Sequence, residues 1–317
     1  MRIVVALGGN ALLRRDQQPD ASVQLSNVRA AVTALAPLAR RHELVITHGN
    51  GPQVGVLALQ SAADRTLTRP YPFDVLGAET QGMIGYWLLQ SLQNALPERQ
   101  VCALLNQTLV SAADPAFADP AKFVGPVYGR AEAERLAAER GWTVRPDGTH
   151  WRRVVPSPRP QRVVETRLIR LLLESGAVAV CAGGGGVPVI RDDHGQLTGV
   201  EAVVDKDLTA ALLAEALDAD ALLLLTDVAH VYRGYGSPGA EPIRRTTPAA
   251  LRAQRFPAGS MGPKVDAVCR FVELTGGTAA IGALEEAHLI LDGAAGTVVT
   301  PGGPHREDGH DTAQDRT

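Results

Sequence analysis

Lysine is the rarest charged residue in this chain, and its few positions are candidates for chemistry. Lysine and arginine together number 31, and only three of them are lysines, Lys122, Lys206 and Lys264. A chain that uses arginine for ordinary surface cations keeps lysine where a compact, mobile ammonium is needed, because a planar guanidinium cannot replace it. The alternative is a coding bias that left three lysines by chance, so the surroundings of each lysine must decide.

Two of these lysines lie at the starts of predicted helices, beside acidic or glycine-rich segments. Lys206 stands between Asp205 and Asp207, and Lys264 follows the run Gly259-Ser260-Met261-Gly262-Pro263. Loop amides, a helix N-terminus and an ammonium can face one anion together. Phosphoryl transfer needs charge neutralised across the oxygens of the transferring group more than it needs covalent chemistry. The pattern predicts phosphate chemistry, whereas a favourable first-turn carboxylate and a solvated lysine are the structural alternative.

Three glycine-rich loops follow predicted strands, namely Gly8-Gly9-Asn10, His48-Gly49-Asn50-Gly51-Pro52 and Gly183-Gly184-Gly185-Gly186. Glycines let backbone N–H groups crowd around an anion, and open α/β sheets bind ligands at the carboxyl ends of their strands. One Gly-Gly pair can be simply a tight turn. Four successive glycines are costly in conformational entropy, which favours close approach of the backbone to a ligand. The commoner nucleotide fingerprints, G-x-x-x-x-G-K-[ST] and G-x-G-x-x-G at a strand–helix junction, are absent.

The elements that must position these loops alternate along the chain between short apolar runs and helical stretches. This pattern is typical of an α/β sheet covered on both faces, and continuous apolar strands suit parallel pairing. Helical periodicity is best at residues 23–41, 74–96, 132–140, 163–175, 207–216 and 264–274. The predicted strands span residues 3–7, 44–47, 101–105, 177–181, 221–226 and 278–281.

Two segments differ from the rest of the chain in residue composition. Residues 111–160 contain prolines at positions 115, 120, 126, 146, 156, 158 and 160, one charged helix and a predicted hairpin around Pro146-Asp147-Gly148. We expect this segment to be an inserted, protruding subdomain. Residues 302–317 are polar and rich in glycine and proline, so we expect a disordered tail in which His305 and His310 form no metal site.

Bulk composition excludes several classes of protein. With 45% hydrophobic residues, 21% charged residues and a net charge of -3, the chain is typical of globular proteins and has no basic stripe for nucleic acid. The N-terminal apolar run is too short for a signal peptide, and no segment approaches the roughly 20 apolar residues of a membrane span. We therefore expect a soluble cytoplasmic protein. Cys102, Cys181 and Cys269 form no C-x-x-C pair and are predicted core thiols, with no metal bound by protein ligands.

Taken together, the motifs resemble the carbamate kinase family over about residues 1–300. Those that carry the resemblance are, in order, Gly8-Gly9-Asn10, His48 through Gly55, Cys181 through Gly186, Val204-Asp205-Lys206-Asp207 and Gly259 through Lys264. The insertion adds Asp119-Pro120-Ala121-Lys122, Gly125-Pro126 and the segment Trp151 through Pro158. These two additions resemble the carbamate kinase subdomain and set the chain apart from acetylglutamate, glutamate, aspartate and uridylate kinases of the same fold.

The resemblance implies a three-layer αβα sandwich around a mainly parallel open sheet, with a small protruding subdomain. Residues 1–301 would form one domain, with an acceptor-binding lobe at about 1–176, the insertion at about 111–160 and a nucleotide-binding lobe at about 177–301. The activity implied is reversible phosphoryl transfer between ATP and carbamate, with Mg²⁺ accompanying ATP or ADP. A homodimer that makes ATP from carbamoyl phosphate during arginine catabolism is also implied.

The resemblance carries over to single residues. It assigns Gly8, Gly9 and Asn10 to the transferring phosphoryl group and Gly49, Asn50 and Gly51 to the carbamate side. Lys206 and Lys264 would stabilise the transition state, Asp207 would hold them, and Lys122 would reach over the acceptor. The nucleotide would contact Gly184, Gly185, Thr226, Asp227, Val228, Tyr235, Pro238, Met261 and Gly262. Gly234 stands where family members often have asparagine, which leaves the local nucleotide contacts open.

The expected chemistry needs no general base. Carbamate is already an oxyanion at neutral pH, so its attack on phosphorus requires no proton removal, and catalysis would rest on positioning and electrostatics. His48 is the one titratable candidate in a loop, and we expect it to have a structural hydrogen-bonding role in preference to a catalytic one. Two alternatives stay open: a kinase of the same fold with another small acid or phosphate as acceptor, and a non-catalytic nucleotide sensor.

Overall fold

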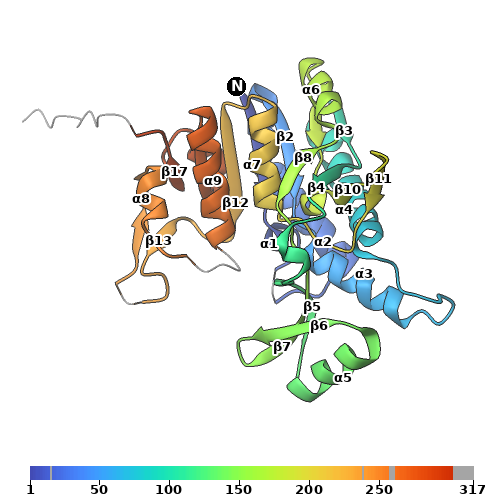
Figure 1. The fold of residues 1–317 in the computed structure, drawn as a ribbon. Helices are drawn as coiled ribbons and strands as arrows, with labels where there is room; N and C mark the ends of the chain where they lie inside the picture. Colours follow the sequence, from blue (N-terminus) through green and yellow to red (C-terminus); the bar gives the residue numbers. More distant parts are fainter. Residues whose placement is uncertain (15, 238, 257–260, 303–317) are drawn as a thin grey trace, which may run out of the picture.

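The centre of the molecule is an eight-stranded sheet with the order β15-β17-β16-β12-β1-β2-β9-β3, seen in a computed structural model that describes residues 1–14, 16–237, 239–256 and 261–302 (Figure 1). Neighbouring strands pair in parallel except β16 and β17. All six strands expected from the sequence lie in this sheet, which confirms the mainly parallel α/β fold. The strands are β1 (Arg2–Leu7), β2 (Glu43–His48), β3 (Val101–Ala103), β9 (Val178–Val180), β12 (Ala221–Thr226), β15 (Arg245–Thr246), β16 (Thr278–Ala283) and β17 (Thr297–Val299).

Side chains of β1 alternate between two hydrophobic cores, one on each face of the sheet. Ile3, Val5 and Leu7 belong to one core, and Val4 and Ala6 belong to the other. This period of two follows from strand geometry, and two apolar faces require two covering layers. The first core includes side chains of α2 (Ala21–Arg41), α4 (Phe73–Ala95) and α10 (Ala287–Leu291), and the second includes those of α6 (Thr166–Glu174), α7 (Lys206–Ala216) and α9 (Met261–Thr275). The fold is therefore a three-layer αβα sandwich.

Local differences from the predicted elements have simple causes. The helix expected at residues 163–175 begins only at Thr166, because Val163 pairs with Thr108 in a second sheet. That sheet has the order β11-β10-β4-β8 and was not predicted, since its strands are short and partly polar. Its strands are β4 (Gln107–Val110), β8 (Pro160–Val163), β10 (Val187–Arg191) and β11 (Leu197–Gly199). The remaining short elements are α1 (Gly9–Leu12), α3 (Gly51–Ala63), η1 (Pro115–Phe117), η2 (Gly183–Gly185), β13 (Val231–Arg233), β14 (Glu241–Ile243), α8 (Pro248–Arg252) and η3 (Leu284–Glu286).

The segment between β4 and β8 forms a small sheet of its own, with the order β5-β7-β6, and carries α5 (Arg130–Arg140). Figure 1 shows it at the bottom, away from the eight-stranded sheet. Asp147 pairs with His150 across the turn, which confirms the predicted hairpin. The strands are β5 (Lys122–Tyr128), β6 (Thr143–Asp147) and β7 (His150–Val155). The division of the chain into two lobes stays a prediction, and the predicted tail, with His305 and His310, lies outside the described residues except for Gly302.

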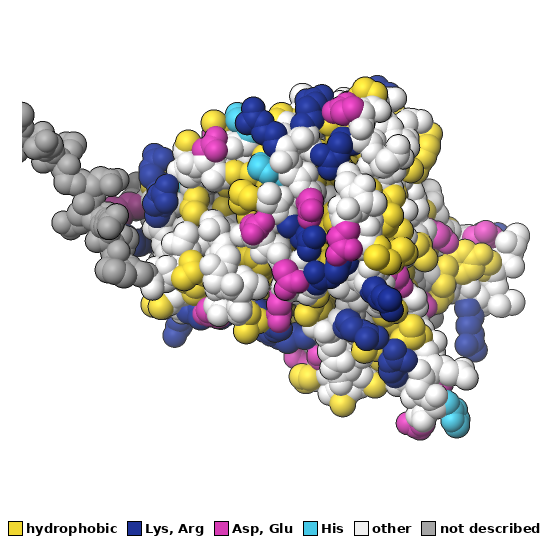
Figure 2. All heavy atoms as spheres, turned by 90° about the horizontal axis from the view of Figure 1, so that it is seen from above, with side chains coloured by type: hydrophobic (Ala, Val, Ile, Leu, Met, Phe, Trp, Pro, Cys, Tyr) yellow, Lys and Arg dark blue, Asp and Glu magenta, His cyan; other side chains and the backbone are white. Residues whose placement is uncertain are grey.

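The cysteines and the surface charges are arranged as the sequence composition suggests. Cys181 and Cys269 are buried thiols, as predicted, and Cys102 is half-buried. Basic and acidic side chains are interspersed on the face shown in Figure 2, with apolar side chains between them. Within the described residues, no helix combines the length and the apolar character needed to cross a membrane.

Candidate active site

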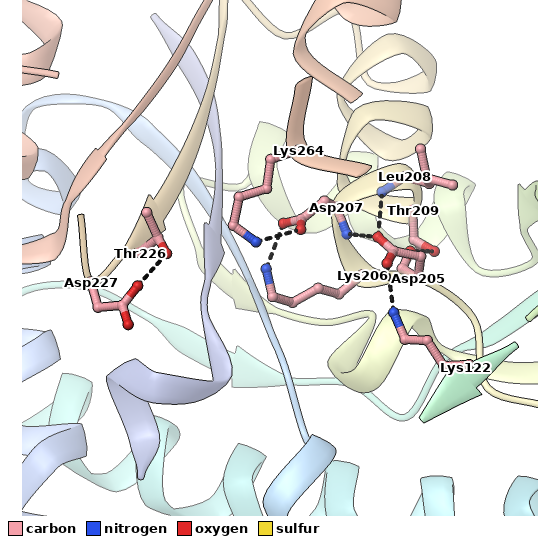
Figure 3. Close-up of polar contacts among 9 residues, drawn as sticks. All are labelled: Lys122, Asp205, Lys206, Asp207, Leu208, Thr209, Thr226, Asp227 and Lys264. Atoms are coloured by element: carbon pink, nitrogen blue, oxygen red, sulfur yellow. Dashed lines mark hydrogen bonds and ion pairs between the residues drawn. The ribbon is translucent and has the colours of Figure 1, made fainter. Parts of the chain in front are cut away.

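All three lysines meet an acidic pair at the start of α7 (Figure 3). The Nζ of Lys206 donates a hydrogen bond to Oδ1 of Asp207 at 2.5 Å, and the Nζ of Lys264 donates to Oδ2 of the same residue at 3.0 Å. The Nζ of Lys122, which comes from β5, donates to Oδ2 of Asp205 at 2.7 Å. If the three lysines were left by a coding bias alone, they would have no reason to lie together in the structure. A common anionic ligand explains why they do.

Asp207 is the buried carboxylate at the centre of the cluster, and its side chain is only 4% exposed. Burial alone would raise the pKa of this carboxyl, but the ammonium groups of Lys206 and Lys264 outweigh it and lower the pKa to about 2. Burial lowers the pKa of Lys206, and the charge of Asp207 opposes that shift. Two ammonium groups against one carboxylate leave one positive charge beside the two loops that are predicted to hold phosphate and acceptor.

The first turn of α7 is fixed by Asp205, which is the N-cap of the helix. Its Oδ1 accepts hydrogen bonds from the backbone N–H of Asp207 at 2.9 Å and of Leu208 at 3.3 Å. This cap satisfies N–H groups that have no partner within the helix. No role was predicted for Asp205, although an acidic residue directly before a predicted helix is an N-cap signal that could have identified it.

The loops after β1 and β2 lie against each other and against Lys206. A Cβ placed on Gly49 would lie 3.1 Å from the backbone N of Gly9 and 3.3 Å from Cδ of Lys206. Leu7 and His48 are partners in the parallel β1–β2 ladder, so both loops leave the same sheet edge. The structure thus brings the predicted phosphate loop and acceptor loop together at the lysine cluster.

Other predicted residues of these loops have structural partners. Gly8 donates its N–H to the carbonyl of Leu225 in β12 at 2.9 Å, and Gly51 begins α3. Asn50 is buried, and its Nδ2 donates to the hydroxyl of Thr80 at 2.9 Å. The side chain of Asn10 lies outside the described parts of the structure.

His48 is fully buried, and its ring is neutral at physiological pH. Burial lowers the pKa of His48 to about 4, against a smaller raising effect from the carbonyl of Gly49. Its Nδ1 lies 3.0 Å from that carbonyl, which can only accept, so Nδ1 donates. This arrangement favours the structural interpretation of His48.

The four-glycine run is packed against the chain itself. A Cβ on Gly184 would lie 2.2 Å from Nδ2 of Asn50, and a Cβ on Gly185 would lie 2.5 Å from the carbonyl oxygen of Val204. Both glycines also have φ in the left-handed region, at +64° and +88°. The structure therefore explains these glycines by internal close approach, which differs from the ligand approach we expected. Their contact with the nucleotide stays a prediction.

The residues predicted for the nucleotide are more widely spread. Thr226 ends β12, Asp227 follows it, and both line a cleft of about 480 Å³ together with residues of α1, α2 and η3. The hydroxyl of Thr226 donates to Oδ1 of Asp227 at 3.0 Å, and Figure 3 shows this pair to one side of the lysine cluster. Val228 is half-buried in the turn that follows. Tyr235, between β13 and β14, is 73% exposed.

Two further nucleotide residues, Met261 and Gly262, open α9 just before Lys264. Pro238, Gly259 and Ser260 lie outside the described residues. Gly234 has φ at +61°, a left-handed conformation that glycine and asparagine share. The exchange of asparagine for glycine at this position is therefore compatible with the same backbone turn.

Among the residues that the structure describes, no three histidines, cysteines, aspartates or glutamates are grouped so that they could hold a metal ion. Magnesium usually keeps several waters and is bound by substrate phosphates with one or two carboxylates. The predicted Mg²⁺, which would arrive with ATP or ADP, stays a prediction.

Comparison with known proteins gives one consistent class. The profile of the amino acid kinase family matches residues 1–282. The carbamate kinase of Rhizobium meliloti is 51% identical over 303 residues, which cover 95% of this chain and 93% of the relative. The carbamate kinase of Escherichia coli K12 is 50% identical over 298 residues, covering 94% and 99%. The structure of carbamate kinase from Giardia lamblia bound to AMP-PNP matches with a TM-score of 0.86 at 37% identity, covering 95% and 98%.

The fold and these relatives define a phosphotransferase. The chain belongs to the amino acid kinase family, and within it to the carbamate kinases. The resemblance found in the sequence is thereby confirmed.

Proposed function

We propose that this enzyme makes ATP and carbamate from ADP and carbamoyl phosphate, and that it runs the reverse reaction when ATP and carbamate are supplied. The observation that carries the proposal is the pair of ammonium groups, Lys206 and Lys264, held on one buried carboxylate at the edge where two glycine loops meet. The names of the relatives support carbamate as the acceptor, and the AMP-PNP complex of the Giardia enzyme supports an adenine nucleotide.

In the ATP-forming direction, a terminal phosphate oxygen of ADP attacks the phosphorus of carbamoyl phosphate. The bond between phosphorus and the carbamate oxygen breaks, and carbamate leaves as an oxyanion. Each ammonium has three donors and uses one on Asp207, so Lys206 and Lys264 each keep donors for the oxygens of the transferring group. No proton has to move, which agrees with a neutral, buried His48.

The other predicted residues complete the proposed site. Gly8, Gly9 and Asn10 would present backbone and side-chain donors to the transferring phosphoryl group. Gly49, Asn50 and Gly51 would face the carbamate side, with Lys122 reaching over it from β5. The predicted adenine and ribose contacts, from Thr226 through Val228 and at Tyr235 and Pro238, would extend the site away from the lysine cluster. Met261 and Gly262 would contact the nucleotide next to Lys264. Nucleotide-bound Mg²⁺ would neutralise phosphate charge.

We also propose the homodimer that the resemblance implies. The outer edge of β3 has no strand partner among the described residues. Apolar side chains are exposed after β3, on α4, which packs against β3, and on α6, which packs against the neighbouring strand β9. These are Tyr86 of α4, Leu105 after β3, and Leu168 and Leu171 of α6. An unpaired edge with apolar neighbours is the kind of surface that a second copy covers. A role in arginine metabolism and a cytoplasmic location stay predictions.

The acceptor is tested by a screen in the ATP-consuming direction. We expect ADP release with magnesium, ATP and carbamate, supplied as ammonia and bicarbonate, and none above background with acetylglutamate, glutamate, aspartate or uridylate. ADP release coupled to NADH oxidation measures each acceptor. Phosphorylation of one of the other acceptors, without activity on carbamate, would assign the chain to another kinase of this fold.

A further inference from the structure

The two carboxylate oxygens of Asp205 serve different parts of the molecule. Oδ1 caps α7 through the N–H groups of Asp207 and Leu208, whereas Oδ2 accepts the hydrogen bond from Lys122 of the insertion (Figure 3). We propose that Asp205 is a positioning residue for the acceptor side of the reaction, because it holds the Lys122 ammonium beside the first turn of α7. The inference deepens the proposed function and rests on it, since that function assigns Lys122 to the acceptor.

The backbone of the insertion is already docked against the main body. Val124 and Val155 share a small apolar core with Val54 of α3 and Phe73 of α4. A second link is the N–H of Val203, which donates to the carbonyl of Pro156 at 3.0 Å. These contacts place β5 next to the segment that leads into α7, so Lys122 begins its reach from a fixed point.

The side chain of Lys122 still needs an anchor of its own. It is 38% exposed, against 13% for Lys206 and 15% for Lys264, and its four-carbon stem is flexible. An ammonium that is ordered only when the acceptor binds loses rotamer freedom at that moment, which weakens binding. Asp205, whose side chain is 12% exposed, orders it beforehand.

Lys122 can keep this contact while it binds an anion. Its ammonium has three N–H donors, and the hydrogen bond to Asp205 uses one of them. The remaining donors suit the oxygens of carbamate or carbamoyl phosphate. The ion pair and the substrate therefore bind the same ammonium together and need not compete for it.

The residue type at position 205 is not explained by the cap alone. Asparagine and serine cap helices about as well as aspartate. Only a carboxylate combines the cap on Oδ1 with an ion pair on Oδ2. This difference allows the two roles of Asp205 to be separated by substitution.

The test is a double-mutant cycle measured as ATP formation from carbamoyl phosphate. We expect Asp205→Asn and Asp205→Ser to keep the cap and melt near the wild-type temperature. Both should raise the KM for carbamoyl phosphate by roughly tenfold, as for loss of one charge-assisted hydrogen bond, and leave the KM for ADP within about twofold. Lys122→Ala should raise the same KM at least as much, and adding Asp205→Asn to it should change the KM little further, because the two act as a unit.

The matched control is Asp119→Asn, which removes another aspartate of the insertion, one that pairs with Arg145 at an exposed position. It should leave both KM values unchanged. Equal increases in the two KM values together with a lower melting temperature would reduce Asp205 to a helix cap. A lower KM for carbamoyl phosphate in Asp205→Asn would show competition with the acceptor, and additive effects in the double variant would show independence. Any of these results overturns the inference alone, whereas an inactive wild type overturns the proposed function first.

Discussion

The Lys206→Arg and Lys264→Arg variants are expected to fold normally, to bind nucleotide within about tenfold of wild type and to lose at least about 100-fold in turnover. Losing one preorganised charge donor at a transition state typically costs 100- to 1000-fold, or roughly 2.7 to 4 kcal/mol. Arginine keeps the formal charge but is longer, planar and forked, so it cannot place that charge on the same oxygen. Both ammonium groups are also held on the two oxygens of one buried carboxylate, so a forked head group has to rearrange this shared contact.

Steady-state kinetics with ADP and carbamoyl phosphate measure this effect, and nucleotide binding is measured separately by titration calorimetry. Arg41→Lys is the matched control, because it exchanges the same two residue types at an exposed position at the end of α2. Near wild-type turnover in both arginine variants would show that the scarcity of lysine is a coding accident and would remove the proposed roles of Lys206 and Lys264.

The Asp207→Asn variant is expected to be destabilised by about 3 to 5 kcal/mol, as when one partner of a buried ion pair is removed. The amide keeps the shape of the side chain but leaves the Lys206 and Lys264 ammonium groups without their shared counter-charge. An anion in the site should then replace part of that charge. We therefore expect ADP to raise the melting temperature of this variant by more than it raises that of the wild type.

Urea unfolding followed by circular dichroism gives the free energy difference. The control is Glu134→Gln, which removes a carboxylate from an exposed pair with Arg130 and should leave stability close to wild type. An Asp207→Asn variant as stable as the control would contradict the picture of two ammonium groups held on one buried carboxylate.

The central fold and the outline of the site could be predicted from the sequence because their signals are local. Six apolar runs gave the six strands around which the sandwich is built, and the rarity of lysine singled out the residues that meet at α7. The second sheet escaped because strands such as Gln107–Val110 are short and half-polar, so their pairing depends on partners distant in the chain.

The packing of the glycine run and the ion pair of Asp205 could not be predicted, because both depend on contacts between residues that are distant in the sequence. The glycines at 184 and 185 face Asn50 and Val204, and the sequence could not distinguish such internal packing from approach to a ligand. The cap role of Asp205 could have been predicted from the sequence, although it was not, whereas its ion pair with Lys122 joins residues 83 positions apart. The docking of the insertion, which creates this pair, follows from tertiary packing.

The most direct test of the account is ATP formation from ADP by the purified wild-type protein, with magnesium and carbamoyl phosphate as the phosphoryl donor. Hexokinase and glucose-6-phosphate dehydrogenase convert the ATP formed into an NADPH signal. We predict continuous ATP formation that requires both ADP and carbamoyl phosphate and is not supported by acetyl phosphate at comparable rates. A protein that is folded and binds ADP but forms no ATP under these conditions would contradict the assignment of the lysine cluster to phosphoryl transfer.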